Sequence, residues 1–312
     1  MLHFILIRLS RASLTILIMV TFAFVILRVS GDPALALLSP ETPASVVEAF
    51  RQSWGLDQPL WVQYLRYLLA IAHGDLGQSM RDGRAAVVVV AERIPTTLLL
   101  TVPALILNIA IGIPAGILAA LKRDSFVDRA VMTSAIAGFT VPSFVLGLLL
   151  VLVFAVELPW LPSGGAGSIQ QMILPVATLG VGGAAVLARF TRSAMLEVLG
   201  EAYIRTGSAK GVAWRRVISG HALPNAAIPI LTIIGFMIGN LIAGTVLVES
   251  VFSWPGLGSL LVVSVMSRDL AVVQCILLFV AAAMILANVL VDVLYGVLDP
   301  RLRATGRTSG GA

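Results

Sequence analysis

Residues 203–229 read YIRTGSAKGVAWRRVISGHALPNAAIP, a long polar and basic interruption between two hydrophobic segments. A segment of this kind lies in water, where its side chains are available to a partner. Gly211 is suited to end a short helix, and Pro224 marks the return of the chain to an apolar segment. The sequence therefore predicts an exposed polar loop between two hydrophobic elements.

The composition around this segment is that of a membrane protein. Of the 312 residues, 58% are apolar and 12% are charged, and the mean hydropathy is +0.99. So little polar surface cannot cover a water-soluble globule of this length, and the chain must be solvated by lipid. Apolar runs of the ~20 residues needed to cross a bilayer occur six times, at residues 12–29, 97–121, 130–156, 172–190, 226–248 and 272–297. These runs predict an all-α membrane protein with about six transmembrane helices.

The basic residues of the short loops and tails predict the orientation of these helices. Cytoplasmic loops carry an excess of Lys and Arg, a rule that applies to short loops, so the polar segment 31–94 is set aside. Thirteen basic residues then fall on one side of the membrane, and Arg268 alone falls on the other. The thirteen are Arg8, Arg11, Lys122, Arg123, Arg129, Arg192, Arg205, Lys210, Arg215, Arg216, Arg301, Arg303 and Arg307. Both termini and the 203–229 segment are expected in the cytoplasm, with residues 31–94 outside.

The expected organisation has four parts. Residues 1–30 form an N-terminal transmembrane anchor, which we expect to be retained because its apolar stretch is longer than that of a cleaved signal peptide. Residues 31–94 form a periplasmic cap, residues 95–300 a five-helix core with a cytoplasmic loop at 192–225, and residues 301–312 a cytoplasmic tail. In the cap, SVVEAFRQSWGL and PLWVQYLRYLLAIA read as two short helices, with Pro59 in the first turn of the second. The cap either seals the outer mouth or also receives a soluble partner.

Polar residues inside two of the apolar runs fall on single helical faces. They are Thr97, Thr101 and Asn108 in the second run, and Gln274, Asn288 and Asp292 in the sixth. Because a polar side chain that faces lipid costs a few kcal/mol, each face points either at other helices or into a translocation path. Ser143, next to Pro142, joins the candidate path residues. For Asp292, near a cytoplasmic end, we expect an ion pair with Arg189 or Arg192.

Glycine and proline residues predict how the apolar helices pack. The pairs Gly112–Gly116 and Gly235–Gly239 place small residues one turn apart, which permits close approach of two helices. Four prolines are expected to break or kink their helices, where neighbouring groups or water can satisfy the freed carbonyls: Pro103, Pro114, Pro142 and Pro229. The pattern is that of a packed bundle.

Several kinds of chemistry are excluded by the residue pattern. The two lysines, Lys122 and Lys210, lie outside any G-x-x-x-x-G-K-[ST] sequence, so the chain has no P-loop for ATP. The three histidines are scattered and Cys275 stands alone, so neither a metal-ligand spacing nor an internal disulfide is present. No catalytic constellation of a membrane enzyme is visible. An ion-coupled secondary transporter stays an alternative, although it calls for central carboxylates, and Glu249 and Asp292 lie near helix ends.

The 203–229 segment resembles the cytoplasmic loop of inner-membrane permease subunits of binding-protein-dependent ABC importers, in the dipeptide, oligopeptide and nickel branch. The consensus of that loop is EAA, three residues, Gly, nine residues, Ile, one residue and Leu-Pro. Here Gly211 and Leu223-Pro224 match, and Arg205-Thr206-Gly207 stand at the EAA positions, close to the YIRTARAKG version of the peptide branch. Further matches are GDPA from Gly31, GLDQPLWVQY from Gly55, HGDLGQS from His73, ERIPTTLLL from Glu92 and NVLVDVLYGVLDPRLR from Asn288.

This resemblance, which covers residues 31–303, implies a type I ABC importer permease in the bacterial inner membrane. It implies that the 192–225 loop holds a coupling helix that docks on an ATPase subunit, with contact residues Tyr203, Arg205, Thr206, Gly207, Ala209, Lys210, Gly211, Leu223 and Pro224. It also implies a periplasmic gate loop that includes Trp254, Pro255, Gly256, Arg268 and Asp269. A second interpretation of Trp254 is an anchor at the membrane interface.

The resemblance further implies a set of partners in the lipid bilayer. One copy of this chain would pair with a homologous second permease and two ATP-binding subunits, and would take its substrate from a periplasmic binding protein. No nucleic acid is involved. The chain itself would be no enzyme and hold no cofactor, because ATP and Mg²⁺ bind to the partner subunits. The implied substrate is a peptide or a peptide-like small solute, and permeases for nickel chelates, opines and glutathione share the same motifs.

Overall fold

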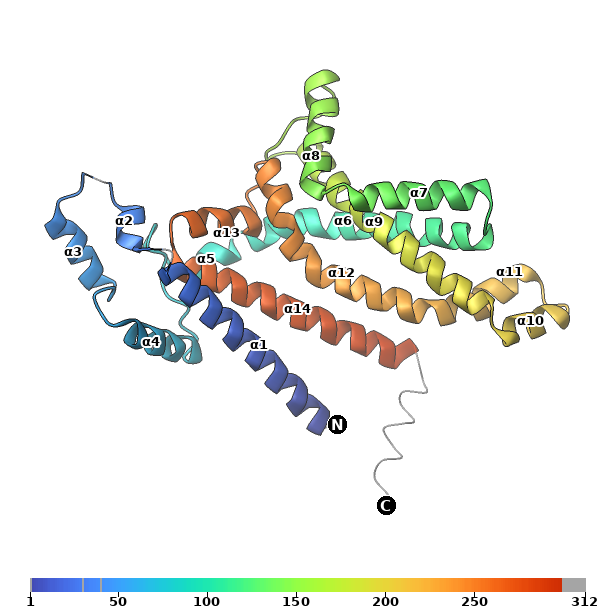
Figure 1. Cartoon of the computed structure of the whole chain (residues 1–312), viewed down its shortest axis with the longest axis horizontal. Helices are drawn as coiled ribbons and strands as arrows, with labels where there is room; N and C mark the ends of the chain where they lie inside the picture. The colour runs from blue at the N-terminus through green and yellow to red at the C-terminus, as the bar shows by residue number, and fades with distance from the viewer. Residues whose placement is uncertain (1, 30, 40, 299–312) are drawn as a thin grey trace, which may run out of the picture. The chain divides into compact units, whose positions relative to one another are not determined.

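The structure is a computed structural model that describes residues 2–29, 31–39 and 41–298. In these residues the chain forms helices and connecting turns, with one isolated β-bridge between Gln78 and Ala85. The helices (Figure 1) are α1 (Leu2–Val29), α2 (Pro33–Leu37), α3 (Ala44–Ser53), α4 (Leu60–Ala72), α5 (Ala86–Ala91), α6 (Ile94–Leu121), α7 (Phe126–Thr140), α8 (Ser143–Val151), η1 (Leu152–Glu157), α9 (Ile169–Leu199), α10 (Ala202–Ala209), α11 (Trp214–Val217), η2 (Ile218–Ala222), α12 (Leu223–Val251), α13 (Leu257–Met266) and α14 (Leu270–Leu298). The chain divides into two compact units, residues 1–97 with 255–283 and residues 98–254 with 284–312. The predicted all-α architecture is confirmed.

In the first unit, α4 packs along α1 through aromatic side chains. Tyr64 Oη lies 2.6 Å from Thr21 Oγ1, and the ring centroid of Phe24 lies 5.3 Å from that of Tyr64 and 6.2 Å from that of Tyr67. Both predicted cap helices are present as α3 and α4, although Pro59 is the N-cap of α4 rather than a residue of its first turn. Away from α1, α4 exposes the apolar side chains of Trp61, Leu65 and Leu69.

Asp32 joins α2 to α3 in the same unit. One carboxylate oxygen of Asp32 caps α2 by accepting a 2.9 Å hydrogen bond from the N–H of Ala34. The other oxygen accepts two hydrogen bonds from Arg51, of 2.8 Å from Nε and 2.6 Å from Nη2. Hydrogen bonding to Asp32, with its negative charge, raises the pKa of Arg51. The segment after α1 is therefore tied to the next helix of the cap.

In the second unit, α9 is the central helix and packs against α7, α8 and α12 (Figure 1). It also approaches α6 closely: a methyl group at Gly112 would lie 2.8 Å from Leu187 Cβ, and one at Gly116 would overlap the carbonyl oxygen of Ala188. The predicted close approach at Gly112–Gly116 is confirmed, because side chains at these positions would force the two helices apart. In the other predicted pair, Gly235–Gly239, there is room for a methyl group at Gly239, so the packing around this residue does not require glycine.

Four stretches are long and apolar enough to cross a membrane, namely Ala86–Leu121, Ile169–Leu199, Trp214–Gly239 and Leu270–Val289. In addition, α1 runs for 28 residues and contains the apolar stretch Ser13–Ile26. Five of the six predicted apolar runs thus lie within single helices, α1, α6, α9, α12 and α14. Pro103, Pro114 and Pro229 lie inside these continuous helices.

The third apolar run, residues 130–156, does not form the continuous span that its length predicts. It is divided into Phe126–Thr140 and Ser143–Glu157, which are bent by 97° relative to each other. The cause is Pro142, because the residue before a proline is disfavoured in the helical conformation. Val141 is accordingly extended, with φ −75° and ψ 120°, and Pro142 itself is the N-cap of α8. The expectation that Pro142 breaks its helix is confirmed.

Candidate coupling segment and translocation path

The surface of α10 is mostly polar and exposed. Tyr203 is 43% exposed, Arg205, Thr206 and Lys210 are exposed, and Ala209 keeps this face free of a large apolar group. Burial, and after it the nearby Glu201 carboxylate, raises the pKa of Tyr203, so its phenol stays neutral at physiological pH. The predicted contact residues of this helix are therefore accessible to a partner.

A Schellman motif ends α10 at Gly211. This glycine has φ +79°, in the left-handed region that only glycine adopts without strain. Its N–H donates a 3.0 Å hydrogen bond to Ser208 O, and the N–H of Val212 donates a 3.3 Å bond to Gly207 O. These are the two bonds that define the motif. The expectation that Gly211 ends the helix is confirmed.

Ile204 fastens α10 to the helices that follow it. This side chain is 2% exposed and shares an apolar cluster with Val217 of α11, Ala222 of η2 and Ala226 of α12. Met195 of α9 belongs to the same cluster. We call this cluster of buried residues, which also includes Ala120, Leu187, Ala194 and Ile230, the α10 joint. Through this joint, α10 is packed against α9 and α12.

The other predicted contact residues lie where α12 begins. Leu223 packs against the α10 joint, and Pro224 is exposed in the first turn of α12. Between α10 and α12, the short helix α11 exposes Trp214, Arg215 and Arg216. The predicted contact residues thus lie on α10, in the turn after it and in the first turn of α12, and α11 and η2 connect the two parts.

Asn108 and Ser143 line one cavity of the second unit, with a volume of about 600 Å³. Asn108 is 1% exposed, its amide lies against Gly183, and its Oδ1 has no hydrogen-bond partner among the described residues. An unpaired amide oxygen is suited to accept a hydrogen bond from a polar solute. The cavity walls are otherwise largely apolar, with contributions from Phe139, Val186, Phe190, Ile233, Phe236 and Met237.

The other predicted path residues lie elsewhere. Thr97 Oγ1 accepts a 2.7 Å hydrogen bond from the N–H of Leu257 and so holds the start of α13. Thr101 and Gln274 are buried, and Asn288 is exposed. The role of these residues in the path stays a prediction. Asp292, for which the sequence predicts an ion pair, lies outside the residues whose side chains are described.

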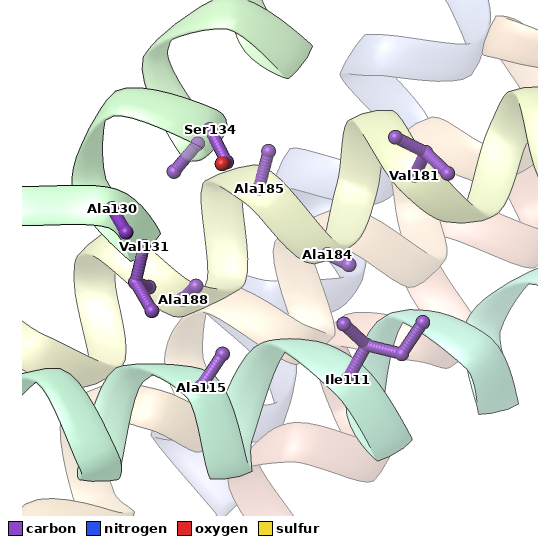
Figure 2. A pocket seen from close by; sticks show the side chains of 10 residues that line it. Ile111, Ala115, Ala130, Val131, Ser134, Val181, Ala184, Ala185 and Ala188 are labelled. Carbon is purple, nitrogen blue, oxygen red and sulfur yellow. The ribbon is translucent and has the colours of Figure 1, made fainter. Parts of the chain in front are cut away.

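A second hollow of the same unit, with a volume of about 330 Å³, lies between α6, α7 and α9. Figure 2 shows that its wall is formed mainly by alanine and other small apolar side chains, with the hydroxyl of Ser134 at one side. Small side chains leave this space because none of them reaches across it. Such a wall suits an apolar group, and it offers a polar solute little to bind.

Trp254, in the predicted gate loop, is 1% exposed. This burial contradicts the interpretation of Trp254 as an anchor at the membrane interface. The backbone N–H of Trp254 donates a 2.8 Å hydrogen bond to the carbonyl oxygen of Glu249, at the C-terminal end of α12. In the next two residues, Pro255 O accepts a 3.3 Å hydrogen bond from Arg93 Nη1, and Gly256 is the extended N-cap of α13. The backbone groups of Trp254 and Pro255 are therefore both hydrogen-bonded, one to the main chain and one to a side chain.

Arg268 and Asp269, the other gate-loop residues, fasten the turn between α13 and α14 to the cap. Arg268 Nη1 donates a 3.2 Å hydrogen bond to Asp32 O. Asp269 is 2% exposed, and its Oδ2 accepts a 2.5 Å hydrogen bond from Ser79 Oγ. Ser79 Oγ also lies 2.9 Å from Asp82 Oδ1. Within the first unit, the cap and this turn are therefore one connected structure.

Sequence reasoning missed an ion pair between α7 and α9. Asp128 is 3% exposed and binds Arg192 through two hydrogen bonds of 2.6 Å. It also accepts a 2.9 Å hydrogen bond from the N–H of Asp124. Arg192 thus has a buried partner that the sequence analysis did not predict, and Arg189 lies over the ring of Phe139. The expected pairing of Asp292 with Arg189 or Arg192 stays a prediction, because the side chain of Asp292 lies outside the described residues. The available signal was the Ser-x-x-Asp pattern at residues 125–128, which is typical of a helix start.

Two family models match most of the chain. The model described as "Binding-protein-dependent transport system inner membrane component" matches residues 112–304. The model described as "Binding-prot-dependent transport system membrane comp, N-term" matches residues 1–101. The N-terminal match includes the cap, and the other match includes the coupling segment and the lining of the 600 Å³ cavity apart from Asn108.

Relatives and a solved structure agree with this assignment. The chain is 47% identical over 273 residues to the glutathione transport system permease protein GsiC of Escherichia coli O6:H1, covering 88% of this chain and 89% of the relative. It is 44% identical over 304 residues to the GsiC protein of Salmonella paratyphi A, covering 97% and 99%. In fold, it is similar to a chain of the inward-facing MetNI methionine ABC transporter, with a TM-score of 0.58 at 19% identity over 67% of this chain and 96% of that one. The chain belongs to the family of inner-membrane permease components of binding-protein-dependent ABC importers.

Proposed function

We propose that this chain forms half of the translocation path of an importer for glutathione or peptides of similar size. The substrate class is supported by the glutathione transport permeases that match along almost the whole chain, and by the peptide-branch pattern at residues 203–211. A homologous second permease supplies the other half of the path. Two ATP-binding subunits supply the energy, and a periplasmic binding protein delivers the solute.

The observation that carries the mechanism is the burial of Ile204 beneath an exposed polar helix. In the proposed complex, the exposed residues of α10 lie in a groove of an ATP-binding subunit, which holds ATP and Mg²⁺. Closure of the two ATP-binding subunits displaces α10. The α10 joint transmits the displacement to α9 and α12 because Ile204, Met195 and Ala226 belong to one packed cluster. In this way the distant cavity changes its access from one side of the membrane to the other.

The proposed path passes the 600 Å³ cavity that Asn108 and Ser143 line. Its largely apolar wall limits the affinity for a peptide, which favours release, while the unpaired oxygen of Asn108 offers a hydrogen bond to an amide or amine of the solute. Gly182 and Gly183 leave room on the α9 side of the cavity. The second permease closes the cavity, because one chain alone does not enclose a solvated path.

The proposed orientation has both termini and α10 in the cytoplasm and residues 31–94 in the periplasm. It is supported by the basic residues of the short loops, which lie almost entirely on the side of α10. This orientation puts α10 within reach of cytoplasmic ATP-binding subunits. It puts the cap, which is joined to the turn at Arg268 and Asp269, within reach of a periplasmic binding protein.

The experiment that tests the proposed function is uptake into proteoliposomes. The complete complex, with binding protein and ATP, is expected to accumulate radiolabelled glutathione, and unlabelled glutathione is expected to compete better than a nickel chelate. The isolated chain is expected to show no flux, with or without a proton or sodium gradient. Gradient-driven flux through the isolated chain would contradict the proposal, and preferential uptake of nickel chelate would contradict its substrate.

A further inference from the structure

One cavity of the first unit gathers polar atoms that lack partners. It has a volume of about 210 Å³, enough for several water-sized molecules, and is lined by α1, α4, α14 and residues 75–80. The buried atoms of its lining residues that have no hydrogen bond in the described structure are Nε of Arg28, Oε1 of Gln63, Oη of Tyr67, and both amide atoms of Gln274. Buried polar groups are normally paired. Their concentration among the lining residues of one cavity makes it a candidate site for a polar ligand.

Gln274 and Gln63 present defined hydrogen-bonding groups to this cavity. Gln274 is 2% exposed, so water on the surface does not reach it freely. The amide nitrogen of Gln63 donates to two carbonyl oxygens, those of Leu56 at 3.2 Å and Gln58 at 2.6 Å. These bonds fix which end of the amide is nitrogen, so Oε1 of Gln63 remains as an acceptor. The cavity thus offers one fixed acceptor and one amide that can both donate and accept.

The charged residues of the lining have opposite signs. Arg28 supplies a guanidinium, which lies 5.7 Å from the centre of the Phe24 ring. Asp75 supplies a carboxylate, one oxygen of which accepts a 2.9 Å hydrogen bond from the N–H of Gly77. A ligand that carries a single charge would be attracted by one of these groups and repelled by the other. A ligand with both charges, close together, satisfies both.

We propose that this cavity binds a zwitterionic group, with its anionic oxygens toward Arg28 and Tyr67 and its amine toward Gln63 and Asp75. The amide of Gln274 bridges the two ends. The γ-glutamyl end of glutathione carries an α-amine and an α-carboxylate on one carbon, so the proposal deepens, and rests on, the proposed function. Phosphatidylethanolamine presents the same chemistry as a phosphate and an amine, and α4 exposes an apolar face at Trp61, Leu65 and Leu69.

The central variant is Gln274→Leu, which removes both unpaired amide atoms and keeps the side-chain volume. The assembled transporter, without binding protein, is placed in nanodiscs of phosphatidylcholine and phosphatidylglycerol, and glutathione binding is measured by calorimetry and by the shift in the unfolding midpoint. We expect Gln274→Leu to weaken binding at least tenfold and to abolish the shift, while the ligand-free midpoint does not fall. Tyr67→Phe, which removes one hydroxyl, is expected to weaken binding as well. The matched control is Gln52→Leu, at an exposed glutamine of α3, which should bind as the wild type does.

A second arm distinguishes the two sources of the zwitterion. Nanodiscs that contain phosphatidylethanolamine and no glutathione are examined by native mass spectrometry. Retention of this lipid by the wild type, and its loss from Gln274→Leu, assigns the site to the headgroup. Glutathione binding that depends on Gln274 in the first arm assigns it to the solute. Either result supports the zwitterion site, whereas a wild type that binds neither compound, or a Gln274→Leu variant that binds both unchanged, overturns it.

Uptake measurements separate this proposal from the proposed function. If the wild type accumulates glutathione with ATP but neither ligand binds in the cavity, the site is wrong and the substrate assignment stands. If glutathione binds in the cavity and is not taken up by the complete complex, the site stands and the substrate assignment is wrong.

Discussion

Arg192 of α9 and Asp128 of α7 form a bidentate ion pair, in which both N–O distances are 2.6 Å. The side chain of Asp128 is almost fully buried, with 4% exposed, and that of Arg192 is 24% exposed. The pair holds the first turn of α7 against α9, three residues before Met195 of the α10 joint. The ion pair and the joint therefore act on the same part of α9.

Removal of one member of this pair is expected to destabilise the second unit. Asp128→Ala leaves Arg192 without its carboxylate and takes the cap from Asp124, so we expect a loss of roughly 3 kcal/mol in the free energy of unfolding. The measurement is the unfolding midpoint of the purified chain in detergent. Asp57→Ala, at an exposed aspartate of the cap, is the control and should have little effect. Equal midpoints for Asp128→Ala and the control would show that the pair contributes nothing.

Gly211 is predicted to matter for two separable reasons. At φ +79°, a residue with a Cβ is strained by about 1 kcal/mol, least for asparagine, so Gly211→Asn should keep most of the activity. Gly211→Arg adds a long side chain that points into open space, because no described neighbouring atom would lie within 4 Å of the new Cβ. The fold of this variant should therefore survive. We expect Gly211→Arg to abolish transport and the stimulation of ATP hydrolysis, because the added side chain blocks docking. Wild-type transport by Gly211→Arg would refute the docking role of this segment.

The contact between α6 and α9 gives a prediction about packing. Gly116→Leu would place side-chain atoms against Ala188 and Thr191 of α9, and we expect it to separate the helices and prevent a stable fold. At Gly239, where the nearest atom to a Cβ would be Met284 Cγ at 3.7 Å, Gly239→Ala should be tolerated. Yield of monodisperse protein and unfolding midpoint are the measurements. If both variants behaved alike, the close approach at Gly116 would not be essential.

The proposed orientation is testable by cysteine labelling in spheroplasts. Ser53→Cys in the cap and Lys210→Cys after α10 are exposed positions, and Cys275, which is buried, is replaced by alanine to remove background. A membrane-impermeant maleimide should label Ser53→Cys and leave Lys210→Cys unlabelled until the membrane is opened. Ser79 is unsuitable because it is 1% exposed and hydrogen-bonded to Asp269. The opposite labelling pattern would invert the topology.

Much of the fold could be predicted because it depends on local rules. Apolar length predicts α1, α6, α9, α12 and α14, and glycine at a helix end predicts the stop at Gly211. Pro142 predicts a break but not its 97° angle, because neighbouring helices determine how far a broken helix turns. Helix ends follow less directly from the sequence: α9 continues to Leu199, past the apolar run, because a helix can carry charged residues wherever it has partners or water.

Contacts between distant residues could not be predicted from one sequence. Thr97 and Asn108 fall on one face of a helix, yet Thr97 binds the backbone at Leu257 and Asn108 lines a cavity. Helical periodicity predicts a face and gives no information on what that face meets. The burial of Trp254 and the pairing of Arg192 with Asp128 could not be predicted for the same reason, because each depends on tertiary packing between segments that are far apart in the chain.

The most direct test of the central claim is photo-crosslinking from α10. In the assembled complex, Arg205 is replaced by p-benzoylphenylalanine, and as a matched control Trp61 of α4 is replaced in the same way, since both side chains are exposed. We predict that irradiation links position 205, and not position 61, to an ATP-binding subunit, with a yield that changes when ATP is bound. A crosslink to the ATP-binding subunit from position 61, or crosslinks from position 205 to lipid alone, would contradict the account of α10 as the coupling helix.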